Sequence, residues 1–267
     1  MDLGLKNKVA LVLASSKGLG LACAKVLYQE GANVMICSRT EEHLKVARAQ
    51  ILELESINEN NHIEYVVANL LYEDQIQLLV DTTRQKFKKI DILIHNAGGP
   101  PSKPVKDVSK EEWTNSIDLN LRSFVRISRL VLPLMEEQGN GNIIAITSVS
   151  VKQPLENLVL SNTTRLGVLG FAKTLSNEYA RKNIRVNVVC PGPTLTDRMK
   201  ELIESNMVQM NKSEKEIKKQ WTVQIPMGRM GHPEELAHLV AFLASDRASY
   251  ITGTAIQCDG GFVSAPF

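Results

Sequence analysis

The sequence is poor in cysteine and contains no cysteine pair at the spacing of a metal or redox motif. Its four cysteines are Cys23, Cys37, Cys190 and Cys258. None of them forms a C-x-x-C motif, which is typical of zinc ligands and dithiol redox sites. Cys37 and Cys190 lie in apolar, strand-like runs. We therefore expect four buried free thiols and predict no metal site.

The sequence also lacks an excess of charge of one sign and any long apolar run. Lysine and arginine number 31 against 29 acidic residues, a net charge of +2, and the two signs are interspersed. No basic face of the kind that binds nucleic acid is visible. No run approaches the roughly 18 apolar residues of a membrane span. The polar start MDLGLKNK fits no signal peptide. We expect a cytoplasmic protein without nucleic-acid or membrane partners.

What the sequence does contain is a regular alternation of strand-like and helix-like segments. Hydrophobic residues make up 43% and charged residues 22%, which is ordinary for a soluble globular protein. The predicted strands are Val9–Leu13, Val34–Cys37, Ile63–Val67, Ile90–His95, Asn142–Thr147 and Ile184–Val189. The predicted helices include Leu19–Glu30, Glu42–Leu54, Glu73–Phe87 and Glu111–Glu137, the last capped by Ser109 and Glu112. Strands that are apolar on both faces indicate a covered parallel sheet. The sequence thus predicts an α/β fold, a single doubly wound Rossmann-type domain over residues 1–267 with helices on both faces.

One segment, Thr194–Gln224, interrupts this alternation. It is polar, has helical periodicity and carries Met199, Met207, Met210 and Trp221. Ser213 and Glu216 form a capping box. We predict a short helical substrate lid over the sheet edge, with two short helices.

The first strand runs directly into a glycine-containing loop and an apolar helix. The loop is Ala14, Ser15, Ser16, Lys17, Gly18, Leu19 and Gly20. A loop of this kind offers backbone N–H groups and a helix N-terminus to a phosphate. A mere tight turn is the alternative, but the position between first strand and first helix favours dinucleotide binding.

The end of the second strand bears on which dinucleotide is bound. An acidic residue there would bind the ribose 2′-hydroxyl, whereas a basic residue would meet a 2′-phosphate. The residues present are Ser38 and Arg39, and Lys17 adds a second cation. The alternative is that both cations are merely solvated surface charges. Their joint placement favours NADP(H).

Further matches span Asn7 to Phe262 and identify a family. They include Asn96-Ala97-Gly98 after the fourth strand, Pro191-Gly192-Pro193-Thr194, and the C-terminal stretches at 228–235, 242–246, 250–253 and 259–261. With the glycine loop, they resemble the short-chain dehydrogenase/reductase family, and within it the β-ketoacyl-acyl carrier protein reductases. The resemblance implies that Asn69 and Leu70 face the adenine, with the Asn69 amide oxygen accepting a hydrogen bond. It also implies that Asn96, Ala97 and Gly98 support the sheet beside the adenosine half, and that Pro191, Gly192 and Thr194 hold the nicotinamide carboxamide.

The loop departs from the family at its first glycine, which is Ala14 here. The added methyl group crowds the turn. Alanine suits such a loop only if its φ stays negative, so we expect a negative φ at this position.

The larger departure is in the catalytic residues, for which the family uses Asn, Ser, Tyr and Lys. Asn120 and Ser148 match the first two, although a helix-kink asparagine and a strand-end turn would explain them as well. The helix that follows aligns Ser161 with the tyrosine and Arg165 with the lysine. An alkyl hydroxyl is far too weak an acid to replace a phenol, so Ser161 cannot be the proton donor. Arg165 stays protonated and could hold the nicotinamide ribose or an anionic substrate. Lys152 is a conceivable substitute acid, although a solvated loop charge explains it better.

These residues leave several functions open. The leading hypothesis is an NADP(H)-dependent reductase, 3-oxoacyl-[acyl-carrier-protein] reductase-like, that reduces a small-molecule carbonyl or imine with altered proton handling. The alternatives are a sensor that binds NADP(H) without chemistry and a structural subunit of an active homologue. The resemblance further implies a homo-oligomer, a tetramer, formed through the helices near Glu111–Glu137 and Leu158–Ala180 and through C-terminal segments ending in Phe262 and Phe267.

Overall fold

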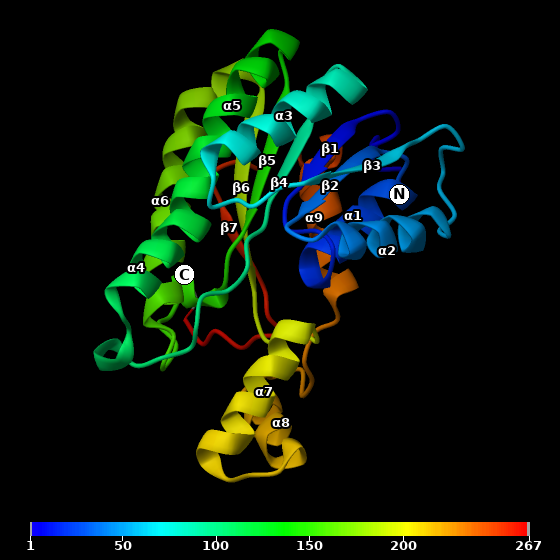
Figure 1. Ribbon diagram of the computed structural model, residues 1–267. Coiled ribbons are helices and arrows are strands. Elements are labelled where there is room, and N and C mark those ends of the chain that lie inside the picture. The colour runs from blue at the N-terminus through cyan, green and yellow to red at the C-terminus, as the bar shows by residue number, and fades with distance from the viewer. Residues whose placement is uncertain (1, 266–267) are drawn as a thin grey trace.

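In the computed structural model, which describes residues 2–265, the fold is built on a seven-stranded sheet in which every pair of neighbours is parallel. The strand order is β3-β2-β1-β4-β5-β6-β7 (Figure 1). The strands are β1 Val9–Val12, β2 Asn33–Ser38, β3 Ile63–Val67, β4 Ile92–His95, β5 Gly141–Ile146, β6 Ile184–Pro191 and β7 Ala255–Cys258. The predicted α/β fold is confirmed, and the predicted strand ends agree to within two residues. The sequence analysis missed β7.

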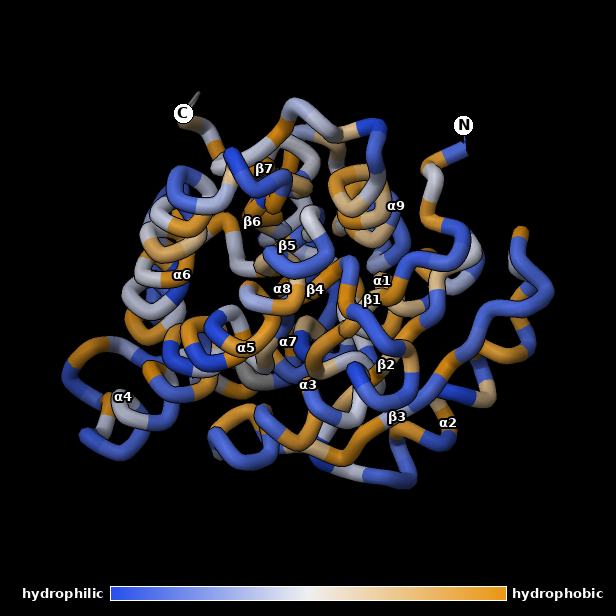
Figure 2. The backbone as a smooth tube through the Cα atoms, turned by 90° about the horizontal axis from the view of Figure 1, so that it is seen from above, coloured by the Kyte–Doolittle hydropathy of each residue, from blue (hydrophilic) through white to orange (hydrophobic). Residues whose placement is uncertain are grey.

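Helices cover both faces of this sheet. One face carries α1 Gly18–Gln29, α2 Glu41–Leu52 and α9 Pro233–Ala244. The other carries α3 Glu73–Phe87, α5 Ser123–Gln138 and α6 Val159–Tyr179. Viewed from above, α5 and α6 lie on one side of the strands and α1 and α9 on the other (Figure 2). Short 3-10 turns lie at Val105–Asp107, Val149–Val151, Ala180–Lys182 and Asp246–Ala248.

The long predicted helix Glu111–Glu137 has the expected extent but is not α-helical throughout. It begins as α4 Lys110–Ser116, passes through a π-helical segment at Ile117–Arg122, and continues as α5. The predicted capping box is present, with Ser109 Oγ accepting from the Glu112 N–H at 3.2 Å. The π segment widens the turn that holds Asn120.

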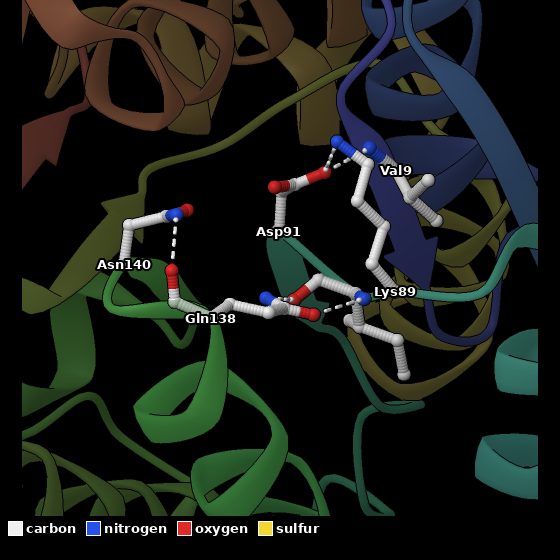
Figure 3. A network of polar contacts seen from close by, with 6 residues as sticks. Val9, Lys89, Asp91, Gln138 and Asn140 are labelled. Carbon is white, nitrogen blue, oxygen red and sulfur yellow. Dashed lines mark hydrogen bonds and ion pairs between the residues drawn. The ribbon is translucent and has the colours of Figure 1, made fainter.

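The amino-terminal edge of the sheet is fixed by a polar network (Figure 3). The Asp91 carboxylate accepts the Val9 N–H at 2.7 Å and pairs with Lys89 at 2.9 Å. The Gln138 side chain bonds both backbone groups of Ile90, at 3.1 and 3.0 Å. These bonds tie β1, β4 and the end of α5 together at this edge. The loops with candidate functional residues lie at the opposite, carboxyl-terminal edge.

The segment predicted as a lid forms two helices, α7 Asp197–Met210 and α8 Glu214–Val223, that project from the carboxyl-terminal edge (Figure 1). The Ser213 and Glu216 capping box is present. Met199, Ile203 and Ile217 pack with Phe262 in a small core of their own. The Trp221 and Phe262 rings are 6.4 Å apart. The predicted role of Phe267 lies outside the described residues.

Two further expectations can be compared with the structure. Cys23, Cys37 and Cys190 are buried free thiols as predicted, but Cys258 is only partly buried because β7 is an edge strand. Within residues 2–265, no helix has the length and apolar character needed to cross a membrane.

Candidate functional site

The candidate site lies where the strand order reverses, between β1 and β4. The chain leaves β1 and β4 toward opposite edges of the sheet, and in doubly wound folds ligands bind outside the carboxyl ends of the strands at such a point. The glycine loop follows β1, and Asn96, Ala97 and Gly98 follow β4. The fold therefore brings these sequence-predicted residues to one place.

The glycine loop has a left-handed backbone at two positions. Gly18 has φ +59°, which glycine adopts without strain. Ala14 has φ +45°, so the expected negative φ is wrong. The turn requires the left-handed conformation whichever residue occupies it, and alanine adopts it at a cost in strain. Gly20 is required for another reason: a Cβ there would lie 2.5 Å from the Ala14 carbonyl oxygen.

Ser15 acts beneath this loop and not on its open side. Its side chain is fully buried, and Oγ donates to the Val12 carbonyl oxygen at 2.7 Å and accepts from the Cys37 N–H at 3.1 Å. The Ser15 N–H donates to the Cys37 carbonyl oxygen at 2.9 Å. These bonds join the loop to the end of β2. The Ser15 side chain therefore acts on a ligand only indirectly, by positioning the neighbouring residues of the loop.

The N-terminus of α1 is open to an anion. Its N-cap residue, Lys17, makes no side-chain capping bond, and the first turn contains no acidic residue. The first N–H groups of a helix have no partner inside the helix, and the helix dipole favours negative charge there. Ser16 and Leu19 flank this opening and are partly exposed. A pyrophosphate fits the donor set that these residues present.

The cations expected to face a 2′-phosphate are accessible. Lys17 and Arg39 are exposed. The Ser38 hydroxyl turns back to its own turn, donating to the Thr40 carbonyl oxygen at 3.1 Å. Because Ser15 ties the Lys17 loop to the end of β2, the two basic residues belong to adjoining loops. The arrangement offers positive charge and no carboxylate at residues 38 and 39.

The residues expected at the adenosine half are held by local hydrogen bonds. Asn69 Oδ1 accepts from the Leu71 N–H at 3.1 Å, which leaves that oxygen one acceptor position. Leu70 beside it is buried. Asn96 Nδ2 donates to the Ala14 carbonyl oxygen at 3.2 Å and so braces the glycine loop. Ala97 is buried, and Gly98 is exposed with open space around its Cα.

The turn expected at the nicotinamide half follows β6 directly. Pro191 is the last residue of β6. A Cβ on Gly192 would lie 2.6 Å from Asp259 Cβ, so only glycine fits at that position. Thr194 Oγ1 donates to the Gly192 carbonyl oxygen at 3.0 Å. Thr196, two residues on, lies against Gly18 of the glycine loop. The start of the lid thus lies beside the expected pyrophosphate site.

Three serines lie together after β5, and two of them are the sequence-predicted Ser148 and Ser161. Ser148 is partly exposed, and its Oγ accepts from the Ser150 N–H at 3.1 Å, which leaves its hydroxyl proton free for another acceptor. Ser161 is buried, and its Oγ lies 3.4 Å from Ser150 Oγ. Sequence reasoning missed Ser150. Ser148 can therefore orient an oxygen, whereas Ser161 is engaged with another hydroxyl.

Arg165 extends beneath the end of β5. Its Nη1 donates to the carbonyl oxygens of Thr147 at 2.8 Å and Ile146 at 3.2 Å. Burial, with the charge of Arg198, lowers the pKa of the guanidinium to about 10, so it remains charged at neutral pH. Its Nε is buried without a partner, and Nη2 has no hydrogen bond among the described residues.

Two other buried polar side chains belong to this region. His95, which sequence reasoning missed, ends β4 with Nε2 3.0 Å from Ser123 Oγ and its ring 4.8 Å from Phe124. Burial, aided by the charge of Arg165, lowers the pKa of His95 to about 3, so the ring is neutral. Asn120 Nδ2 donates to the Ser116 carbonyl oxygen at 3.2 Å, and its Oδ1 is buried without a partner. A buried histidine at a strand end leaves no periodicity signal that could have identified it.

The lid is attached to the opposite side of the crevice through Arg198 of α7. Its Nη2 donates to the Pro100 carbonyl oxygen at 2.9 Å, and Nη1 pairs with Glu201 at 3.2 Å. Lys152, the conceivable substitute acid, is partly exposed and has no resolved hydrogen bond to Ser148. Among the described residues, the site combines the glycine loop and the open N-terminus of α1 with Ser148 and several cations, and no tyrosine is among the residues predicted for it.

Known proteins are similar to this chain in sequence and in fold. The enoyl-(acyl carrier protein) reductase family model matches residues 13–263. The 3-oxoacyl-[acyl-carrier-protein] reductase FabG of Thermotoga maritima is 33% identical over 259 residues, covering 97% of this chain and 99% of that protein. Human dehydrogenase/reductase SDR family member 4 is 34% identical over 258 residues, 96% of this chain and 88% of that protein.

A solved structure extends the likeness to three dimensions. L-sorbose reductase from Gluconobacter frateurii, complexed with NADPH and L-sorbose, has a TM-score of 0.93 and 30% identity over 99% of this chain and 100% of its own. The YwfH reductase of bacilysin biosynthesis, described as NADPH dependent, has a TM-score of 0.91 and 27% identity, covering 97% and 100% of the two chains. The family model, the relatives and the fold agree, and the chain belongs to the short-chain dehydrogenase/reductase family.

Proposed function

We propose that this protein is an NADP(H)-dependent reductase of a small carbonyl or imine compound, with proton handling that differs from its family. The observation that carries the proposal is the pairing of an open α1 N-terminus with Lys17 and Arg39 and no acidic residue at the end of β2. The NADPH complexes of related reductases support it.

The cofactor would supply a hydride, and each group of residues would have a separate part. The backbone N–H groups near Gly18 and Gly20 would bind the pyrophosphate, and Lys17 and Arg39 the 2′-phosphate. The turn at Thr194 would hold the carboxamide. Ser148 would donate a hydrogen bond to the substrate oxygen and so orient it.

The proton would not come from Ser161. Its hydroxyl is a far weaker acid than the phenol of the family, and it is buried against Ser150. Arg165 can stabilise negative charge that develops on oxygen but does not give up its proton at neutral pH. We propose that water, or an ionisable group of the substrate itself, completes the reduction. An iminium substrate would need no proton at all.

Cofactor preference tests this proposal directly. We expect nicotinamide fluorescence titrations to show tighter binding of NADPH than of NADH. Arg39→Asp should reverse the preference, since it replaces attraction by repulsion and adds an acceptor for a free 2′-hydroxyl. Loss of a charge-assisted bond predicts a change of roughly tenfold or more. Arg181→Asp, an exposed site on the 3-10 turn after α6, is the matched control and should change nothing. Equal affinities for NADH and NADPH at physiological salt would contradict the proposal.

A sensor that binds NADP(H) without turnover is the second candidate. It is favoured by one observation, the engagement of both Ser161 and Arg165 with other protein groups. Turnover on a panel of carbonyl and imine compounds separates it from the reductase. A purely structural subunit would fail to bind NADPH in the first place.

We also propose that the protein is a homo-oligomer, a tetramer by resemblance. Leu166 on α6 is 47% exposed and Tyr250 is fully exposed, so apolar surface is available for a second copy. Light scattering that gave a monomer would contradict this assembly.

A further inference from the structure

The charge on Arg165 has no counterion among residues 2–265. The side chain is 8% exposed, and its hydrogen bonds go to backbone carbonyl oxygens. No carboxylate among residues 2–265 lies within ion-pair distance of it. A buried charge without an opposite charge is costly, and an anion that enters the site would relieve that cost.

Other cations surround the same region. Arg198, on the lid, acts on Arg165 as a like charge, and Lys152 and Arg165 both act on the buried Cys190 thiol. Glu201 partly offsets Arg198, and Asp259 is the acidic residue that also acts on Cys190. Positive charge therefore predominates around Arg165.

The guanidinium also retains donors for a ligand. Nη1 is used by Thr147 and Ile146, whereas Nη2 has no hydrogen bond among the described residues. A charged N–H donor of this kind suits a carboxylate oxygen, which accepts such groups in a strong hydrogen bond.

Resting on the proposed function, we infer that the substrate is an oxo acid whose carboxylate binds Arg165 while Ser148 holds its carbonyl oxygen. Arg165 is bound to the carbonyl of Thr147, the residue directly before Ser148. Arg165 and Ser148 therefore belong to the same end of β5, where one ligand can reach both side chains. Arg198, from the lid, is a second cation close enough to act on the charge of Arg165.

Binding of oxamate to the protein saturated with NADPH tests the inference without any turnover. Oxamate carries a carboxylate beside an amide carbonyl, and oxamide is its neutral counterpart. By calorimetry we expect oxamate to bind the wild-type complex. Arg165→Gln should weaken its binding at least about tenfold, the cost of one charged hydrogen bond. Oxamide should bind weakly to both. Arg165→Lys should give an intermediate affinity, because charge is kept and the planar fork is lost.

Two additional variants keep the test decisive if Arg165→Gln fails to fold. Arg198→Gln lies on a partly exposed lid position and should weaken oxamate binding by a smaller factor. Arg181→Gln is the control and should leave it unchanged. Oxamate affinity that is the same in wild type and in both site variants would overturn the inference. If Arg165→Gln weakens NADPH and not oxamate, the guanidinium serves the cofactor ribose and the inference is wrong while the reductase stands. Failure of the wild type to bind NADPH would instead refute the proposed function.

Discussion

Replacing Ala14 by glycine should stabilise the folded protein, although alanine-to-glycine changes usually do the opposite. Ala14 has φ +45°, in the left-handed region that costs an L residue about 1–2 kcal/mol. Glycine removes that strain. It also frees the unfolded chain, which costs about 0.5–1 kcal/mol. The difference leaves a net gain of about 0.5–1 kcal/mol in the free energy of unfolding.

Urea unfolding followed by circular dichroism, without cofactor, measures this free energy. Ala22→Gly on α1 is the matched control, because Ala22 lies inside a helix, where glycine costs about 1 kcal/mol. The two substitutions should therefore have opposite signs. If Ala14→Gly lowered the free energy of unfolding as much as Ala22→Gly, the loop could not have the left-handed backbone described above. The inference that its first position requires a glycine-like conformation would then fail.

Other predictions concern the catalytic position, pH and the lid. The double change Ser161→Tyr with Arg165→Lys should raise reduction of a simple β-ketoester by up to about 100- to 10,000-fold, the range for a general acid, and neither single change should suffice. Strong wild-type ketone turnover that survived Ser161→Ala would show another acid, with Lys152 the first residue to test. Because burial lowers the pKa of His95 to about 3, unfolding releases a group that takes up a proton below about 6.5. Stability should therefore be fully present above pH 6.5 and fall as pH drops toward 3. His95→Gln should flatten that slope in pH-dependent urea unfolding, and an unchanged slope would contradict a neutral buried ring. Amide hydrogen exchange over residues 194–224 should be faster than in the core strands and should slow with NADPH; exchange as slow as in the core strands, with or without cofactor, would exclude a mobile lid.

The parts of the fold that the sequence predicted well are those with a strong hydrophobic pattern. β3 and α3 match their predicted ends, because apolar residues with the right period fill both. β7 was missed since its sequence, AIQC, is short, mixed in polarity and half-buried at the sheet edge. The π segment near Asn120 was missed for the opposite reason: the apolar pattern continues through it without a break.

The candidate site could be assembled from the sequence only in outline. The chain order of strands and helices brings Ser148 and Ser161 together once the fold is known, and Ser150 links them. The partners of Arg165 could not be predicted, because they are backbone carbonyls of a strand 18 and 19 residues earlier in the chain. The sign of φ at Ala14 was predicted wrongly, since residue type alone disfavours what the turn imposes. The identity of a side chain predicts which chemistry it can perform better than it predicts which backbone groups it contacts.

The bonds from Arg165 to the end of β5 limit the order in which a tyrosine and a lysine could be introduced at residues 161 and 165. The guanidinium spans two successive carbonyl oxygens with one nitrogen and still presents another. A lysine side chain has a single nitrogen, so it would bind either the carbonyl oxygens at the end of β5 or the ligand. Restoring lysine first loosens a strand end, and restoring tyrosine first sets a bulky ring in the buried space of Ser161. Each single step costs stability before any activity is gained, so lineages that carry this pair should keep both residues or exchange both together.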